Sequence, residues 1–495
     1  MLNIKKIQDI MRNDAGVNGD AQRIEQIVWI LFLKLYDEYE KEWKRESQMK
    51  FGNYTSIIPT DLSWDSWAKD DKDGEAMTGD VLLKFVNTEL FPSLKNLNFS
   101  KDAPLHHRII KQAFEDTNNY MKDGILLRQV INEIDLIELK HSREDQANLS
   151  NTYETFLKAL QSAGNAGEFY TPRAVTEFVM HILKPRLGNK IADLACGTGG
   201  FLISAYHYLE SQCTTADDRD TLNNAFYGIE KKSLPFILCA TGFLINGLEY
   251  PSLEHESAFD TFKNPDELGA LPKFDIIAMN PPYGGSEQKQ IQERFSKSYR
   301  SSETADLFMA IITERLSQNG KAAVVLPDGF LFGNDTAKIN LKKRLLEEFN
   351  LHLIVRLPAG VFAPYITITT NLLFFDKSPL GTKQTWFYRL DMPEGIKSFG
   401  KTKVMKLEHF APFFEWDKNR IAIEEANGNF KAQVYSKEEL ETKNYNFDLC
   451  GFVSEEEEIL EPFELIEQIK SERERLNATL NSLMNQISDI IKDNE

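Results

Sequence analysis

The chain has 495 residues, and this length predicts about two to four domains of ~150 residues each. Hydrophobic residues make up 42% of it and charged residues 27%, as in a globular protein with a sizeable core. No apolar run reaches the ~18 residues of a membrane span, the N-terminus is unlike a signal peptide, and the four cysteines lack metal-ligand spacing. We therefore expect a cytoplasmic protein without membrane contact and without a metal site.

The net charge of −18 bears on the choice of substrate. A protein that wraps DNA by itself is usually basic, because it must neutralise phosphates. Either the substrate is not DNA, or a separate partner supplies most of the phosphate contacts.

Residues 1–150 have the pattern of an α-helical domain. The clearest helix is predicted over residues 21–43, where apolar side chains recur at helical spacing. These side chains are Ile24, Ile27, Val28, Leu31, Leu35 and Tyr39. Further helices are predicted over residues 81–90, ending before Pro92, and over residues 106–121. No side chains here have catalytic spacing, so we predict an accessory or docking domain.

A second domain is predicted over residues 151–435. From Lys190 onward, strand-like and helix-like segments alternate, which predicts an α/β fold with a doubly wound, Rossmann-like sheet. The predicted strands cover residues 190–196, 225–230, 252–257, 274–280, 322–326, 353–357 and 371–376, and residues 386–390 are a further candidate. Residues 305–316 are predicted to form an amphipathic helix.

The last part, residues 436–495, is predicted to be a tail with one long helix, whereas residues 426–446 are polar and irregular in pattern. After Pro462 a heptad seam begins, in which residues step by three and four and one position is polar. The seam consists of Ile466, Ile469, Arg473, Leu476, Leu480, Leu483, Ile487 and Ile490. Its spacing alone predicts either a partner helix from another chain or packing against the helix's own domain.

The segment Asn280-Pro281-Pro282-Tyr283 follows an apolar run and ends a predicted strand. The Asn280 amide oxygen and the Pro281 carbonyl offer two acceptors at a fixed spacing. An NH2 group held by both of its hydrogens can direct its nitrogen lone pair at an electrophile, and Tyr283 offers a flat face on which a planar substrate can stack. Four such residues alone more often form a turn after a core strand, so the interpretation depends on the other motifs.

A glycine-rich turn lies where the first predicted strand passes into a helix; residues 193–201 read DLACGTGGF. Its glycines allow a tight turn and a close approach by a ligand, as in the cofactor elements of doubly wound folds. The turn lacks the spacing of dinucleotide and P-loop motifs, which disfavours NAD and ATP. Its composition resembles the S-adenosylmethionine loop, in which Asp193 would face the amino acid end of the cofactor.

Three further residues are candidates for contacts to the cofactor or for the local fold. Glu230 ends the second predicted strand, where a carboxylate can accept hydrogen bonds from both ribose hydroxyls, or can simply face solvent. Glu256, after the third strand, is a weaker candidate for a contact with the cofactor's adenine. Thr171 is predicted to be the N-cap of a helix whose first residue is Pro172.

Taken in order, residues 168–173, residues 193–201, Glu230 and residues 280–285 resemble the modification (methyltransferase) subunit of type I restriction–modification systems. That family often has proline at the position of Leu194 and phenylalanine at that of Tyr283. The resemblance implies a site-specific, adenine-specific DNA methyltransferase that uses S-adenosylmethionine. It also implies as partners double-stranded DNA, a specificity subunit bound through the helix at residues 466–490, a second modification subunit and a restriction subunit.

The resemblance also implies roles for individual residues. The cofactor would be covered by Glu168, Phe169, Tyr170, Thr171, Pro172 and Arg173. Its methionine part would lie on Gly197, Thr198 and Gly199, and its ribose against Glu230. Asn280 and Pro281 would bind the amino group of a flipped adenine, and Tyr283 would stack on the base. Phe374 or Phe375 would form the other wall of the base pocket, although strand phenylalanines more often belong to the core.

Two other interpretations remain open from the sequence. Glutamine-N5 methyltransferases that act on proteins use the same Asn-Pro-Pro-Tyr segment, but they lack a helical domain of this kind and the C-terminal seam. A non-catalytic scaffold would keep the fold and hold a DNA-binding partner. The presence of Asn280 and of the glycine-rich turn argues against such a scaffold.

Overall fold

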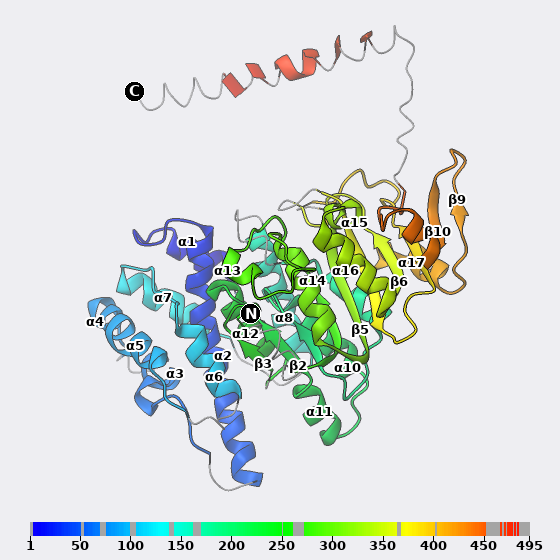
Figure 1. Cartoon of the computed structure of the whole chain (residues 1–495). Helices are drawn as coiled ribbons and strands as arrows, with labels where there is room; N and C mark the ends of the chain where they lie inside the picture. The colour runs from blue at the N-terminus through cyan, green and yellow to red at the C-terminus, as the bar shows by residue number, and fades with distance from the viewer. Residues whose placement is uncertain are drawn as a thin grey trace. The chain divides into compact units, whose positions relative to one another are not determined.

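The structure is a computed structural model with two separate units, Met1–Gly451 and Phe452–Glu495 (Figure 1). It describes residues 3–50, 54–69, 76–99, 105–137, 143–161, 170–249, 251–260, 272–363, 368–400, 403–451, 466–467, 470–471, 473–478, 480–481 and 483–484. Among these residues, no helix is long and apolar enough to cross a membrane.

The N-terminal part of the first unit is helical, as predicted, although the helix predicted over residues 106–121 ends earlier, at Phe114. Its helices are α1 (Ile4–Met11), α2 (Asp20–Lys50), η1 (Thr60–Leu62), α3 (Trp64–Trp67), α4 (Gly79–Phe85), η2 (Val86–Leu90), α5 (Phe91–Lys95), α6 (Leu105–Phe114), α7 (Gly124–Asp135) and α8 (Arg143–Gln161). The predicted stop before Pro92 is wrong. η2 passes directly into α5 in helical conformation, and Pro92 is the second residue of α5.

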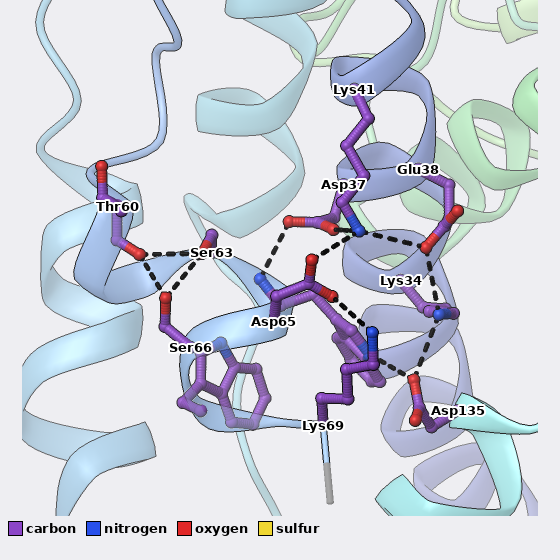
Figure 2. A network of polar contacts seen from close by, with 12 residues as sticks. Lys34, Asp37, Glu38, Lys41, Thr60, Ser63, Asp65, Ser66, Lys69 and Asp135 are labelled. Carbon is purple, nitrogen blue, oxygen red and sulfur yellow. Dashed lines mark hydrogen bonds and ion pairs between the residues drawn. The ribbon is translucent and has the colours of Figure 1, made fainter. Parts of the chain in front are cut away.

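A network of charged side chains joins α2 to α3 and α7 (Figure 2). Lys41 Nζ on α2 lies 2.7 Å from Asp37 Oδ2 and 2.9 Å from Asp65 Oδ2 on α3. Lys34 Nζ lies 3.1 Å from Asp135 Oδ1 on α7. Burial alone would lower the pKa of Lys41, but its hydrogen bonds to Asp37 and Asp65 raise it, so the ammonium stays charged. The network therefore fixes how these three helices meet.

Among the described residues, ten strands form one mixed sheet in the order β3-β2-β1-β4-β5-β7-β6-β8-β10-β9. The strands are β1 (Ile191–Asp193), β2 (Phe226–Ile229), β3 (Ser252–Glu254), β4 (Phe274–Met279), β5 (Leu316–Pro327), β6 (Phe349–Arg356), β7 (Thr370–Lys377), β8 (Gln384–Arg389), β9 (Ile423–Glu424) and β10 (Phe430–Ser436). β3, β2, β1, β4 and β5 are parallel, and β7 is antiparallel to both of its neighbours. The predicted α/β architecture is confirmed.

The two faces of the sheet belong to two separate hydrophobic clusters, because side chains alternate along a strand. In β4, Ile276 and Ala278 belong to the cluster that includes residues of α9 (Arg173–Leu183), α10 (Gly200–Glu210) and α12 (Ser233–Ile245). Ile277 and Met279 belong to the other cluster, with residues of α14 (Thr304–Arg315) and α16 (Thr336–Glu347). Because it is buried on both faces, β4 is apolar at every position except Asp275.

Short helices lie between the strands and near the end of the first unit; they are α11 (Ala216–Asn223), α13 (Lys289–Gln292), α15 (Asp328–Phe332), η5 (Leu407–Phe410), α17 (Ala411–Asp417) and α18 (Lys437–Thr442). The expectation that residues 426–446 are irregular is wrong, since they contain β10 and α18. β10 pairs in antiparallel fashion with β8, but of its seven residues only Ala432 is buried. A strand so exposed has no apolar run by which to recognise it.

The helical N-terminal part packs on the sheet region through α12. The Tyr39 hydroxyl on α2 donates to Leu244 O on α12 at 2.8 Å, and Trp43 Nε1 donates to Glu249 Oε2 at 2.7 Å. The predicted domain boundary before Asn151 falls inside α8, whose Tyr153 hydroxyl donates to Leu238 O on α12 at 2.7 Å. The division at residues 150 and 435 stays a prediction.

The described residues of the second unit are helical at positions 466–467, 470–471, 473–478, 480–481 and 483–484. Four of the predicted seam residues here expose about half or more of their surface: Ile466, Leu476, Leu480 and Leu483. Ile469, Ile487 and Ile490 lie outside the described residues.

Candidate active site

The site lies at the point where the strand order of the sheet reverses. β1 and β4 are parallel neighbours, with Ile191 opposite Ile276, yet β1 continues to β2 on one side and β4 to β5 on the other. Loops that leave the carboxyl ends of such strands diverge and leave a crevice between them. The glycine-rich turn follows β1, and Asn280 follows β4.

A pocket of about 1110 Å³, including the part open to solvent, fills this crevice. Residues from the loops after β1, β2 and β4 line it, together with residues that precede α9 and residues of α14. The end of β1 and the first three loops contribute, among others, Asp193, Ala195, Gly197, Glu230, Lys232, Asn280, Pro281 and Tyr283. A space of this size admits a nucleoside-sized ligand.

The backbone of the glycine-rich turn needs glycine. Gly197 and Gly199 have φ of 54° and 80°, in the left-handed region. A Cβ on Gly199 would lie 2.7 Å from Cys239 Sγ, on α12. The Gly197 N–H donates to Glu230 Oε2 at 2.9 Å, so the carboxylate after β2 holds the turn after β1.

Two buried carboxylates face the pocket, and the pKa of each is raised. Burial raises the pKa of Asp193 well above its ordinary value; the hydrogen bond from Ala195 N opposes this and the neighbouring Glu230 adds to it. Burial likewise raises the pKa of Glu230 against hydrogen bonds from the Lys232 and Gly197 N–H groups. The Lys232 charge also opposes the rise in the pKa of Glu230. A positively charged ligand beside the two carboxylates would favour their charged forms.

The Asn280 side chain makes a hydrogen bond at each end of its amide. Its Nδ2 donates to Thr171 Oγ1 at 3.2 Å, and its Oδ1 accepts from the hydroxyl of Tyr283. That hydroxyl also lies 3.2 Å from Val325 O. Pro281 is buried and Tyr283 half-buried, so the segment is held against the end of the sheet.

The segment before α9 is tied to two other elements. The Tyr170 hydroxyl donates to Glu154 of α8, and Arg173 Nε donates to the same carboxylate at 2.9 Å. Arg173 also donates through a terminal nitrogen to Gly200 O at 2.9 Å. Thr171 is not the N-cap that its position predicts. Pro172 is the N-cap, without a side-chain hydrogen bond, and the hydroxyl of Thr171 is used by Asn280.

The predicted cofactor residues do not all line the pocket. Tyr170, Thr171, Asp193, Gly197, Glu230 and Glu256 do so. Thr198 and Gly199 belong to the turn but not to the lining, whereas Pro172 and Arg173 line a smaller adjoining pocket. Glu168 and Phe169 lie outside the described residues.

The pocket is also lined by aromatic residues that no sequence motif indicates. Phe374 and Phe375 are fully buried, and Phe374 packs edge-on against Phe178, so neither forms a pocket wall as predicted. Phe362, in the loop after β6, and Phe308, on α14, line the pocket instead. No sequence motif identifies these two residues, because only the folding of the chain places them beside the pocket.

Comparison with known proteins accounts for nearly the whole chain. Residues 144–460 match the family described as N-6 DNA Methylase, and residues 3–134 match the HsdM N-terminal domain. The chain is 44% identical to the type I restriction enzyme EcoEI methylase subunit of Escherichia coli, over 99% of this chain and 96% of that protein. It is 27% identical to the EcoKI methylase subunit of the same species, over 82% and 74%.

Solved structures agree with the sequence matches. A type I modification subunit from Vibrio vulnificus YJ016 shares 37% identity and a TM-score of 0.76, over 88% of this chain and 92% of that one. A chain from a structure concerning complex assembly of the type I R-M system shares 32% identity and a TM-score of 0.77, over 99% and 98%. The chain thus belongs to the N-6 DNA methylase family and is an adenine-specific DNA methyltransferase, the methylase subunit of a type I restriction–modification system.

Proposed function

We propose that this pocket binds S-adenosylmethionine beside an adenine flipped out of duplex DNA, and that Asn280 holds the N6 amino group during methyl transfer. When bound, S-adenosylmethionine supplies an electrophilic methyl group on a positively charged sulfur. The buried Asp193 and Glu230 carboxylates fit a cation, and the positive φ of Gly197 allows a close approach of ligand to backbone.

We assign the predicted roles along the pocket. Asp193 faces the amino acid end of the cofactor, the turn with Gly197, Thr198 and Gly199 carries the methionine part, and Glu230 binds ribose. The segment of residues 168–173 covers the cofactor. Tyr170 and Thr171, which line the pocket, support the last assignment.

The base occupies the side of the pocket formed by residues 280–283. The N6 of adenine inside a duplex is out of reach of the cofactor, so the base must leave the stack. Asn280 Oδ1 and the Pro281 carbonyl accept its two amino hydrogens and fix the nitrogen lone pair. Tyr283 stacks on the ring. The rate then depends on positioning and on fixed dipoles more than on a strong base.

One observation carries this proposal. The glycine-rich turn and Asn280, 80 residues apart or more along the chain, line the same pocket at the reversal of the sheet. With a cofactor bound at the glycine-rich turn and a second ligand held by the acceptors of Asn280 and Pro281, a small group could pass directly from the cofactor to that ligand.

The test is Asn280→Ala, assayed in the complex with the specificity subunit for methyl transfer to DNA. We expect the rate to fall about 100-fold or more, because the amino group loses an acceptor that acts in the transition state. Asn340→Ala, on α16 and away from the pocket, is the matched control and keeps the wild-type rate. Methylation at the wild-type rate by the Asn280 variant would show that the assigned role is wrong.

We further propose that the seam at residues 466–490 binds a helix of the specificity subunit. Two methylase subunits would then join one specificity subunit, and the restriction subunit would bind to this complex. The exposed Leu476, Leu480 and Leu483 support a partner helix. The net charge of −18 supports recognition of DNA on another chain.

A further inference from the structure

The orientation of the Asn280 amide is as important as its position. An asparagine amide can turn by 180° with little change of shape, and the turn exchanges an acceptor for a donor. With Oδ1 toward the base, the amide accepts a hydrogen from the adenine amino group. With Nδ2 toward the base, two donors meet and the amino group is repelled.

Thr171 is the partner of the amide nitrogen in the first of these orientations. Its hydroxyl oxygen accepts from Asn280 Nδ2 at 3.2 Å, which leaves Oδ1 on the opposite side of the amide. There Oδ1 accepts from the Tyr283 hydroxyl. The amide is thus already oriented as an acceptor before DNA arrives.

Thr171 is itself held in place from both sides. Its neighbour Tyr170 donates to Glu154, and Arg173 donates to Glu154 at 2.9 Å and to Gly200 O at 2.9 Å. Thr171 is 9% exposed. The segment that carries this hydroxyl is therefore fixed to α8 and to the glycine-rich turn, and it offers Asn280 an acceptor at one defined point.

We propose that Thr171 is a positioning residue for methyl transfer: its hydroxyl holds the Asn280 amide with Oδ1 toward the adenine amino group. This inference rests on the role of Asn280 proposed above. It assigns to Thr171 an action through Asn280 in addition to its place beside the cofactor. It also joins the two halves of the pocket, since the segment that covers the cofactor orients the group that holds the base.

Two variants of Thr171 separate this action from simple packing. Thr171→Val keeps the shape of the side chain but removes the hydroxyl, and Thr171→Ser keeps the hydroxyl but removes a methyl group. Both are assayed in the assembled complex by single-turnover methylation at saturating cofactor and DNA, with cofactor affinity measured by calorimetry. We expect the valine variant to lose about 10-fold in rate, as for a lost hydrogen bond, and to bind S-adenosylmethionine within about 3-fold of the wild type. The serine variant stays within about 3-fold in rate.

The other outcomes overturn the proposal. A wild-type rate in Thr171→Val, or an equal loss in Thr171→Ser, would show that the hydroxyl does not position Asn280. So would a defect confined to cofactor affinity. If the valine variant does not fold, Thr171→Ala removes the same hydroxyl and must lose rate likewise. Asn280→Ala in the same assay distinguishes the two failures: an active Asn280 variant refutes the proposed function, whereas an inactive one beside an active Thr171→Val refutes only this inference.

Discussion

The hydroxyl and the ring of Tyr283 make different contacts in the pocket. Its hydroxyl donates to Asn280 Oδ1 and lies 3.2 Å from Val325 O, which ties the ring to the end of β5. The ring is half-buried beside Pro281 and Pro282. Under the proposed function, Oδ1 would accept from the adenine amino group in addition to this hydroxyl, because an amide oxygen has two lone pairs, and the ring would stack on the base.

We predict different results for two substitutions of Tyr283. Tyr283→Phe removes one donor to Oδ1 and keeps the ring, so kcat/KM for DNA methylation should stay within about 10-fold of the wild type, the effect of one hydrogen bond. Tyr283→Ala removes the stacking surface and should lower kcat/KM by about 5- to 150-fold. Steady-state kinetics on the assembled complex measures both. A large loss in the phenylalanine variant would mean that the hydroxyl takes part in the reaction.

The N-terminal helices are joined by charged groups as well as by apolar packing. Asp37 exposes 5% of its side chain, and its Oδ1 accepts from Trp64 N at 3.0 Å while its Oδ2 faces Lys41. Burial raises the pKa of Asp37, and the hydrogen bond to Lys41 opposes that rise. The Asp37 carboxylate therefore depends on Lys41 to remain charged in its buried position.

Lys41→Met should destabilise this region, because it leaves a buried carboxylate without its cation. We expect a loss of about 1–3 kcal/mol in the free energy of unfolding, measured by denaturant titration at neutral pH. Lys44→Met, three residues along α2 at an exposed position, is the control and should change the free energy of unfolding little. Equal stability of the two variants would show that the network contributes nothing beyond packing.

At the scale of the whole molecule, the chain divides into a large unit that holds the pocket and a C-terminal unit that has no core of its own among its described residues. Contacts within the large unit extend to its last residue. Gly451 O accepts from Arg356 at 2.9 Å, and Arg356 also pairs with Asp448. Assembly and chemistry should therefore be separable by mutation.

Leu480→Asp places a charge on the seam, and we expect it to weaken binding of the specificity subunit about 30-fold or more, as for a central interface residue. Asn481→Asp adds the same charge one position away and should leave binding unchanged. Both variants should bind S-adenosylmethionine like the wild type. The measurement is co-purification followed by a binding titration. Unimpaired binding by the leucine variant would place the interface elsewhere.

The sequence predicts those parts of the fold and the site that local pattern controls. The run at residues 274–280 predicts β4, because a strand buried on both faces is mostly apolar. β10 could not be predicted, since only one of its residues is buried. The contact of Thr171 with Asn280 could not be predicted either. It joins residues 109 apart in sequence, and it depends on where α8 and the glycine-rich turn place the segment before α9.

The helix α12 limits how this protein can be altered. From Pro235 to Ile245 every residue is buried, and its neighbours include Tyr39 of the N-terminal helices, Tyr153 of α8 and Gly199 of the glycine-rich turn. Substitutions on any face of α12 would therefore disturb packing. A chimera that takes the N-terminal helices of a related protein would need to take α12 as well, and with it the residues that contact the glycine-rich turn.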